Sequence, residues 1–303
     1  MNVSDMKRIG IYLFTAVALC ACSGEDDPDV SPVPEQVPVV LDAGIPVVSR
    51  AVIENGGSFT AGIGGWETAS ASADYSEAAT WYTTAGITAS ASARAVTLSE
   101  AQHYNGNNAV RTHMLAWHPA GEPADGKVAF PNADGTVDVM LASPLSGSKD
   151  DNTGKVLEFT HRSTQLKFKV IADPSLPEGT EVRRITVKEA RLPVGFDLAA
   201  SKVLFGAASP LDVPGLETPV KITGKAATAG MPVMVMPMSG NTVKLKIETS
   251  AATYSDVTAI IDGDSDFVEG KAYAITLTFR QQSLGLSAIV AEWTSGTGSA
   301  EVL

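Results

Sequence analysis

The chain has 303 residues, of which 44% are hydrophobic and 18% are charged. This composition can build sizeable cores and excludes intrinsic disorder, and the length favours two modules. Acidic residues outnumber Lys and Arg by 34 to 22, so the net charge is −12 and nucleic acid is not an expected partner. The only two cysteines, Cys20 and Cys22, lie near the N-terminus, which leaves the body of the chain without a disulfide or a thiolate metal cluster.

Residues 1–21 have the pattern of a lipoprotein signal peptide. A basic Lys-Arg pair precedes the apolar run 9–19, which is shorter than the about 20 residues that span a bilayer. The run ends in Leu-Cys-Ala-Cys at residues 19–22, which resembles a bacterial lipobox, where a small residue precedes the acylated cysteine. Cys22 is the predicted lipidation site and mature N-terminus, because bulky Leu19 directly precedes Cys20.

Residues 22–50 are predicted to form an acidic, proline-rich tether and a removable strand. The acidic run 23–29 leads into a stretch with prolines at 32, 34 and 38, which disfavour regular structure and keep a chain extended. The acidic run resembles the signal that sends Bacteroidetes lipoproteins to the outer face of the outer membrane, and the alternative is a solvated spacer. We therefore expect a surface-exposed protein of the cell outer membrane.

From residue 37 onward the chain reads as all-β, because short β-branched segments alternate with turn residues and no stretch holds a helical apolar period. The clearest alternations are 166–170, 243–247 and 273–279. Further strands are predicted at 109–117, 127–130, 137–142, 156–160, 182–190, 220–223 and 233–236. Residues 67–101, rich in Ala, Ser and Thr, are expected to form a surface loop or one short helix. So many short strands favour Greek-key sandwiches.

The polar stretch 143–154 is the predicted hinge between two modules, because it lacks a strand pattern. It divides the chain into an N-terminal β-sandwich over residues 51–152 and a C-terminal β-sandwich over residues 153–303.

Signatures of catalysis and of cofactor binding are absent from the sequence. It contains no serine-nucleophile elbow, HExxH, phosphate-binding loop or dinucleotide fingerprint, so no catalytic residue and no cofactor are predicted. His113 and His118 are an odd number of positions apart in a predicted strand and should point to opposite faces. Residues 262–266 begin like a calcium loop, but Phe267 stands where that loop needs glycine. No metal site is predicted.

The tryptophans leave a second class of function open. Isolated tryptophans in sandwiches are usually core anchors, but exposed aromatic rings paired on one face would favour a glycan-binding surface lipoprotein. The four tryptophans are Trp66, Trp81, Trp117 and Trp293.

Three stretches carry motifs that together resemble one family. Residues 157–170 place Phe-x-His ahead of an alternating strand, residues 267–277 contain Gly-Lys-x-Tyr, and residues 288–296 contain Trp-x-x-Gly. In this order, behind a lipobox, they resemble the fimbrillin-like proteins of Bacteroidales, which are the subunits of type V pili. The resemblance implies two transthyretin-like Greek-key β-sandwich domains in tandem and a structural or adhesive subunit, not an enzyme.

The resemblance also implies a route of maturation. A lipidated precursor reaches the surface, an arginine-specific protease removes its N-terminal segment, and a strand from another pilin subunit fills the exposed groove, so that a homo- or heteropolymeric fimbrium grows. The cleavage candidate is the bond between Arg50 and Ala51. Two alternatives stay open, an ordinary inter-strand arginine and an uncleaved subunit that anchors the pilus. Pro38 and Pro46 weaken any ladder that the removable segment could form.

The donor-strand candidate is the C-terminal segment 284–303. Leu284, Leu286, Ala288 and Val290 fall on one face of an extended chain, and Trp293 falls on the other. The alternative is that this segment closes the sheet of its own domain.

Overall fold

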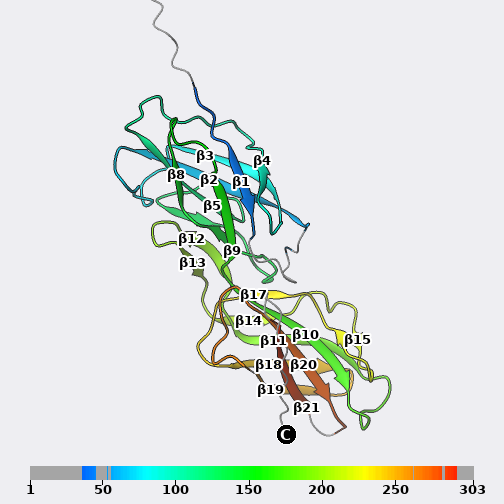
Figure 1. The fold of residues 1–303 in the computed structure, drawn as a ribbon. Coiled ribbons are helices and arrows are strands. Elements are labelled where there is room, and N and C mark those ends of the chain that lie inside the picture. The colour runs from blue at the N-terminus through cyan, green and yellow to red at the C-terminus, as the bar shows by residue number, and fades with distance from the viewer. Residues whose placement is uncertain (1–35, 46–52, 54–55, 262, 282–283, 292–303) are drawn as a thin grey trace, which may run out of the picture. The chain divides into compact units, whose positions relative to one another are not determined.

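The computed structural model describes residues 36–45, 53, 56–261, 263–281 and 284–291 (Figure 1). Every regular element within these ranges is a β-strand, which confirms the predicted all-β class. The described residues include no helix that is long and apolar enough to cross a membrane.

The first sheet is built from strands of the N-terminal half of the chain. Eight described strands belong to it, with β8 paired to β5 beside the main path. In spatial order the path is β3 (Trp81–Thr88), β2 (Ser58–Thr68), β5 (Arg111–His118), β7 (Met140–Ala142), β9 (Val156–His161), β1 (Leu41–Gly44) and β4 (Arg94–Val96), and β8 is Leu145–Gly147.

This first sheet curls back on itself. Beyond β4, Leu98 forms a bridge with Ala85 of β3, and the Ser99 N–H donates to the Thr84 carbonyl at 2.8 Å. The two ends of the strand path therefore meet, and a hydrophobic core that includes Ile63, Met114 and Phe159 lies inside the curl.

Two further sheets form a sandwich in the C-terminal half. One has the order β16 (Ala227–Thr228), β10 (Thr164–Ala172), β20 (Ala272–Phe279) and β21 (Leu284–Ala291), with β17 (Val233–Val235) also paired to β10. The other has the order β14 (Ser209–Asp212), β11 (Glu181–Ala190), β18 (Thr242–Thr249) and β19 (Thr253–Ile260), with β15 (Val220–Lys221) also paired to β11.

The core of this sandwich follows from the alternation seen in the sequence. Phe168 of β10 and Ile275 of β20 belong to the same buried cluster as Ile185 of β11 and Leu245 of β18. Alternate residues such as Lys169 face outward. The alternation predicts strands 166–170, 243–247 and 273–279, and all three are confirmed.

A small third β-structure joins strands from both halves of the sequence. Its order is β13 (Lys202–Phe205), β12 (Pro193–Asp197) and β6 (Lys127–Ala129), and the amide of Asn132 also donates to the Pro193 carbonyl at 3.0 Å. The first sheet extends to the end of β9, and β8 lies inside the predicted hinge. The division into two sandwich domains at residue 152 stays a prediction.

The expectation for residues 67–101 is wrong. This stretch contains the end of β2 and all of β3 and β4, with no helix. Its Ala, Ser and Thr residues weaken the apolar alternation on which strand prediction depends, but β3 pairs along eight residues with β2. Backbone pairing with β2 therefore stabilises β3 as a strand, although its own apolar alternation is weak.

Strand β2 is rich in glycine, and each glycine clears space for an aromatic ring. Glycine normally weakens a strand and marks a place where other groups approach the backbone closely. Here a Cβ on Gly65 would overlap the Trp81 ring, and one on Gly62 or Gly64 would meet the Trp117 ring. Trp66 and Trp117 are buried at 4% and 0% exposure. They are core anchors, so neither ring is presented to a sugar.

The family motifs support the fold. Phe159 packs edge-on against Phe59 at 5.3 Å, and His161 Nδ1 lies 3.0 Å from Asp138 Oδ1 in a buried pair. In the Gly-Lys-x-Tyr motif, the fully buried Tyr273 donates from its hydroxyl to Asp264 at 3.0 Å, and Lys271 Nζ lies 3.2 Å from the same carboxylate. Both motifs therefore fix loops to strands.

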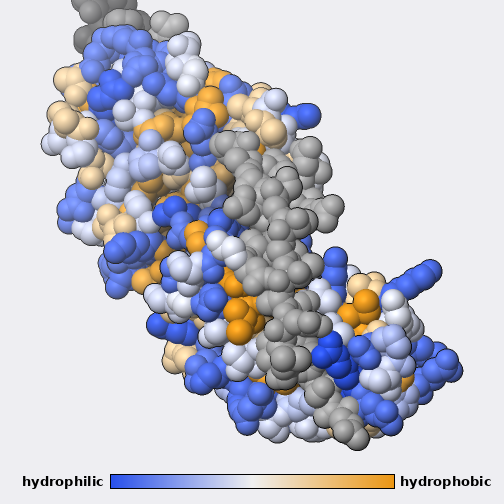
Figure 2. Space-filling view, turned by 60° about the horizontal axis from the view of Figure 1, so that its bottom comes forward, coloured by the Kyte–Doolittle hydropathy of each residue, from blue (hydrophilic) through white to orange (hydrophobic). Residues whose placement is uncertain are grey.

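The surface is mostly polar. On the face shown in Figure 2, orange residues lie in small groups among blue and white ones. The described large hydrophobic residues that are exposed are Val40, Val194, Met231 and Val268.

The contact between Gly65 and Trp81 generates a stability prediction. Gly65→Ala should lower the free energy of unfolding by about 1–3 kcal/mol, because the added methyl group must displace a packed ring. Gly86→Ala on neighbouring β3, where an added Cβ meets nothing within 4 Å, should change it by less than about 1 kcal/mol. Urea unfolding of both variants tests this, and equal effects would contradict the packing account.

Candidate functional site

Strand β1 lies inside the first sheet and has a partner along each edge. It runs parallel to β9, with Ala43 opposite Leu157, and antiparallel to β4, with Ala43 opposite Arg94. Among the described strands, β1 alone precedes Arg50. A segment near the start of the chain therefore completes a sheet made from later residues.

The pairing continues beyond the four residues of β1. The Val39 N–H donates to the Gln102 carbonyl at 2.8 Å, the Tyr104 N–H donates to the Val37 carbonyl at 2.9 Å, and the Ile45 N–H donates to the Ser90 carbonyl at 2.9 Å. We call the space that residues 37–45 occupy the β1 slot. Its walls are residues 90–104 on one side and 155–158 on the other.

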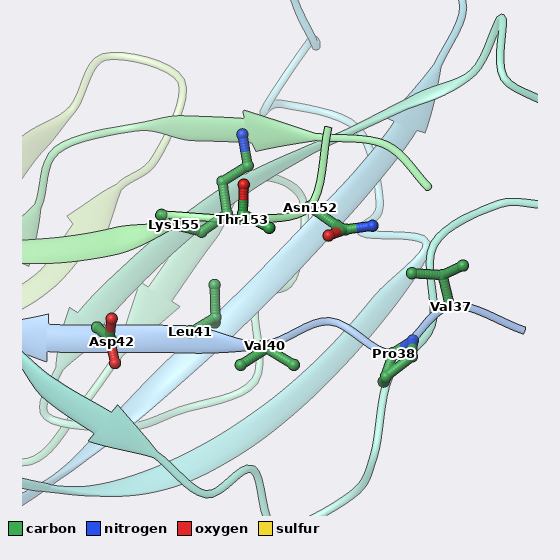
Figure 3. Close-up of a pocket in the computed structure, with 9 residues that line it drawn as sticks. Val37, Pro38, Val40, Leu41, Asp42, Asn152, Thr153 and Lys155 are labelled. Carbon is green, nitrogen blue, oxygen red and sulfur yellow. The ribbon is translucent and has the colours of Figure 1, made fainter. Parts of the chain in front are cut away.

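The side chains of the segment in the β1 slot alternate between core and solvent. Val39, Leu41, Ala43 and Ile45 are exposed by only 6%, 1%, 1% and 1%, whereas Val40 is 60% exposed. Figure 3 shows Val40 and Leu41 pointing to opposite sides of the strand. The slot therefore offers both backbone hydrogen bonds and a row of apolar sites, which are the two features that bind an extended strand.

An open hollow of about 400 Å³ lies where the segment enters the sheet. In Figure 3, Asn152, Thr153 and Lys155 of the loop before β9 line it opposite Val37–Asp42. Asp151 holds this loop in place, because Lys155 Nζ and Arg111 Nη2 lie 2.7 and 2.6 Å from its carboxylate. Hydrogen bonds from Lys155 and Arg111 keep the pKa of Asp151 below its usual range.

Tyr104 and Gly44 show how the segment and its walls fit together. Burial, together with the nearby Asp151 carboxylate, raises the pKa of Tyr104 to about 12, so its phenol stays neutral at physiological pH. Gly44 brings the backbone of the segment close to the opposite wall, since a Cβ there would lie 3.2 Å from the Ser90 carbonyl oxygen. The site is suited to holding an extended strand.

The predicted site residues fall in different parts of the structure. Cys22, Arg50, Ala51 and Trp293 lie outside the described residues. Leu284, Leu286, Ala288 and Val290 belong to β21, which pairs antiparallel with β20 along its whole length. The structure therefore places this segment as an edge strand of its own sheet, and its role as a donor stays a proposal.

The other candidate side chains have separate partners. His113 Nε2 lies 3.3 Å from the Ser70 carbonyl, and His118 Nδ1 lies 2.7 Å from the Thr60 carbonyl. The Asp266 carboxylate accepts a hydrogen bond from the Gly240 N–H at 2.7 Å. No group of three or more metal-ligating side chains is found in the described part of the chain.

Sequence reasoning missed how completely β1 is built into the sheet. The prolines at 38 and 46 suggest a weak ladder, but Leu41–Gly44 is free of proline and pairs on both edges. The signal in the sequence is the alternation from Val39 to Ile45. Nothing local indicates that its partners lie near residues 94 and 157.

Comparison with known proteins identifies the family. A family model described as fimbrillin-like matches residues 49–293. The chain belongs to the fimbrillin-like family. The match begins next to Arg50, so β1 lies outside the matched region of this fimbrillin-like chain. No curated protein matches the sequence significantly.

Solved structures with similar folds come from Bacteroidales. A candidate cell adhesion protein from Bacteroides uniformis aligns with a TM-score of 0.55 at 20% identity, covering 85% of this chain and 99% of that one. A second candidate cell adhesion protein, from Bacteroides ovatus, aligns with a TM-score of 0.55 at 14% identity, covering 86% of this chain and 99% of that one. A fimbrial assembly protein from Parabacteroides distasonis aligns with a TM-score of 0.51 at 11% identity, covering 88% of this chain and 98% of that one. At these identities the likeness is one of fold.

Two neighbouring residues of the β1 segment should differ sharply in their effect on stability. Leu41→Ala in the uncleaved chain should lower the free energy of unfolding by about 2–5 kcal/mol, because it leaves a cavity in the core. Val40→Ala, at an exposed position, should change it by less than about 0.5 kcal/mol. Chemical denaturation measures the free energy of unfolding of both variants. A Leu41→Ala variant as stable as the parent would show that the segment in the β1 slot contributes little to the stability of the chain.

Proposed function

We propose that this fimbrillin-like chain is a structural or adhesive subunit of a type V pilus, exported as a lipoprotein, cleaved after Arg50 and assembled by donor-strand exchange. The observation that carries the proposal is the position of β1, which is paired on both edges yet precedes the candidate cleavage site. A chain that is cleaved after Arg50 keeps every other described strand but loses β1 from inside the first sheet.

Cleavage after Arg50 would create a binding site for a strand. Loss of residues 37–45 removes the partners of β4 and of one edge of β9, and it exposes the apolar sites that Leu41 and Ile45 had filled. Unpaired backbone groups beside exposed apolar surface are a template for another strand. The family match that begins at residue 49 supports this boundary.

The strand that fills the slot would come from another pilin subunit. Segment 284–303 is the donor candidate, because β21 is at the edge of its sheet and follows every other described strand, so its removal does not interrupt the rest of the fold. A donor that leaves one subunit to enter the next makes a head-to-tail contact, and such contacts propagate a fibre.

Before cleavage, lipid would hold the precursor at the cell outer membrane. Cys22 follows an apolar run and a small residue, and the acidic tether after it is suited to surface exposure. After cleavage the mature chain would begin at Ala51 and enter the fimbrium without the lipid.

Lipidation at Cys22 can be tested against its neighbour. Cys22→Ser should abolish incorporation of radiolabelled palmitate in a Bacteroidales host, because it removes the only thiol that follows a small residue. Cys20→Ser is the matched control and should keep the label. Label lost in the Cys20 variant and kept in the Cys22 variant would assign the lipid to the other cysteine.

Cleavage at Arg50 can be tested by mass and N-terminal sequencing. An arginine-specific protease should convert the precursor to a chain beginning at Ala51, and SDS-resistant ladders should follow. Arg50→Lys should block both events, because lysine keeps the charge but not the recognised side chain. Arg183→Lys, at an exposed arginine of β11 away from the slot, is the control and should behave like the parent.

A precursor that stays uncut and monomeric on the cell surface would contradict this proposal. It would favour the alternative in which the chain keeps its lipid and anchors the pilus.

A further inference from the structure

The loop that leads from the wall of the β1 slot to β5 contains an Asn-Gly pair, Asn105-Gly106. Gly106 is exposed and Asn105 is half-buried. The Asn107 N–H donates to Asn105 Oδ1 at 2.9 Å, so the side chain of Asn105 folds back over the backbone that follows it, as in an Asx turn. The chain has one other Asn-Gly pair, at residues 55–56, and Asn55 lies outside the described residues.

This arrangement suits one covalent reaction. The backbone nitrogen of Gly106 can attack Cγ of Asn105, because glycine has no Cβ to hinder the approach. The attacking nitrogen gives its proton to water, the Cγ–Nδ2 bond breaks, and Nδ2 takes a proton from water and leaves as ammonia. Water then opens the five-membered succinimide ring, and an aspartate or isoaspartate replaces the asparagine. The hydrogen bond from Asn107 polarises the Asn105 side-chain carbonyl toward this attack.

The side-chain amide of Asn105 also attaches the loop to the first sheet. Its Nδ2 donates to Glu67 Oε2 of β2 at 2.7 Å, which is a hydrogen bond to a charged acceptor. An aspartate at position 105 has no proton to donate, so two carboxylates would face each other at this contact and repel. Deamidation therefore replaces an attachment of the loop by a repulsion.

The residues just before Asn105 hold the entry end of the segment in the β1 slot. His103 forms a bridge with Pro38, and the Tyr104 N–H donates to the Val37 carbonyl at 2.9 Å. Val37 and Pro38 line the hollow where this segment enters the sheet (Figure 3). A change in the position of Asn105 thus acts on the wall that holds the first residues of the segment.

We propose that Asn105 is a site of spontaneous deamidation, and that its conversion to aspartate or isoaspartate loosens the hold of residues 103–104 on Val37 and Pro38. The modification is irreversible and needs only water. It marks the age of a chain at the entry end of the β1 slot, and it takes place whether or not the chain is cleaved after Arg50.

Peptide mapping of the aged, uncleaved chain tests the reaction. The protein is kept at mildly alkaline pH and body temperature and is then digested with trypsin. The peptide of residues 95–111 contains Asn105 together with Asn107 and Asn108, which have no glycine after them and serve as internal controls. Asn105 should convert at least about tenfold faster than either control. Equal rates at the three asparagines would overturn the proposal.

Hydrogen exchange tests the consequence. Asn105→Asp, which reproduces the aspartate product, should speed exchange of the Tyr104 amide in the uncleaved chain at least about threefold, because it removes a hydrogen bond and adds a repulsion. Exchange at the parent rate in this variant would contradict the proposed loosening.

The matched control combines Asn105→Asp with Glu67→Gln. The side-chain amide of the new glutamine can donate to the new aspartate, so a hydrogen bond replaces the repulsion between the two side chains. Exchange of the Tyr104 amide should return to within about twofold of the parent. A double variant that exchanges as fast as the single variant would show that the contact with Glu67 does not hold the loop, which also overturns the proposal.

Discussion

The pairing of β1 on both of its edges is the constraint on which the first sheet depends. A strand at the edge of a sheet can be removed at modest cost, but β1 connects β9 with β4, and the sheet closes beyond β4 through Leu98 and Ala85. Burying one large aliphatic side chain stabilises a protein by about 1.5–3 kcal/mol, and β1 and its flanks bury three of them. That sum is a large part of the about 5–15 kcal/mol that holds a typical domain together.

The C-terminal sandwich does not share this dependence. Its core draws on residues between Leu166 and Phe279, and its strands pair with one another. The small sheet in which β6 pairs with β12 then links it to the N-terminal half. A loss confined to the β1 slot therefore leaves the larger buried cluster intact.

The motifs that identify the family hold the structure together. Tyr273 and Lys271 fix a loop through Asp264, and His161 meets Asp138 at the end of β9. The glycines of β2 serve the same end, because they let the Trp81 and Trp117 rings lie against the backbone. The β1 slot differs from these motifs in that it holds its segment through backbone pairing and apolar contact.

The sequence by itself determined the all-β class, most strand positions and the family, because alternation and short motifs are local properties that need no partner to be recognised. It also showed the alternation of Val39, Leu41, Ala43 and Ile45. Only the tertiary structure decided that this segment lies between β9 and β4, and that the stretch 67–101 contains β3 and β4. Strand pairing joins residues that are far apart in the chain, and the slot owes its shape to that pairing. A local pattern therefore reveals the strand but not the space that it fills.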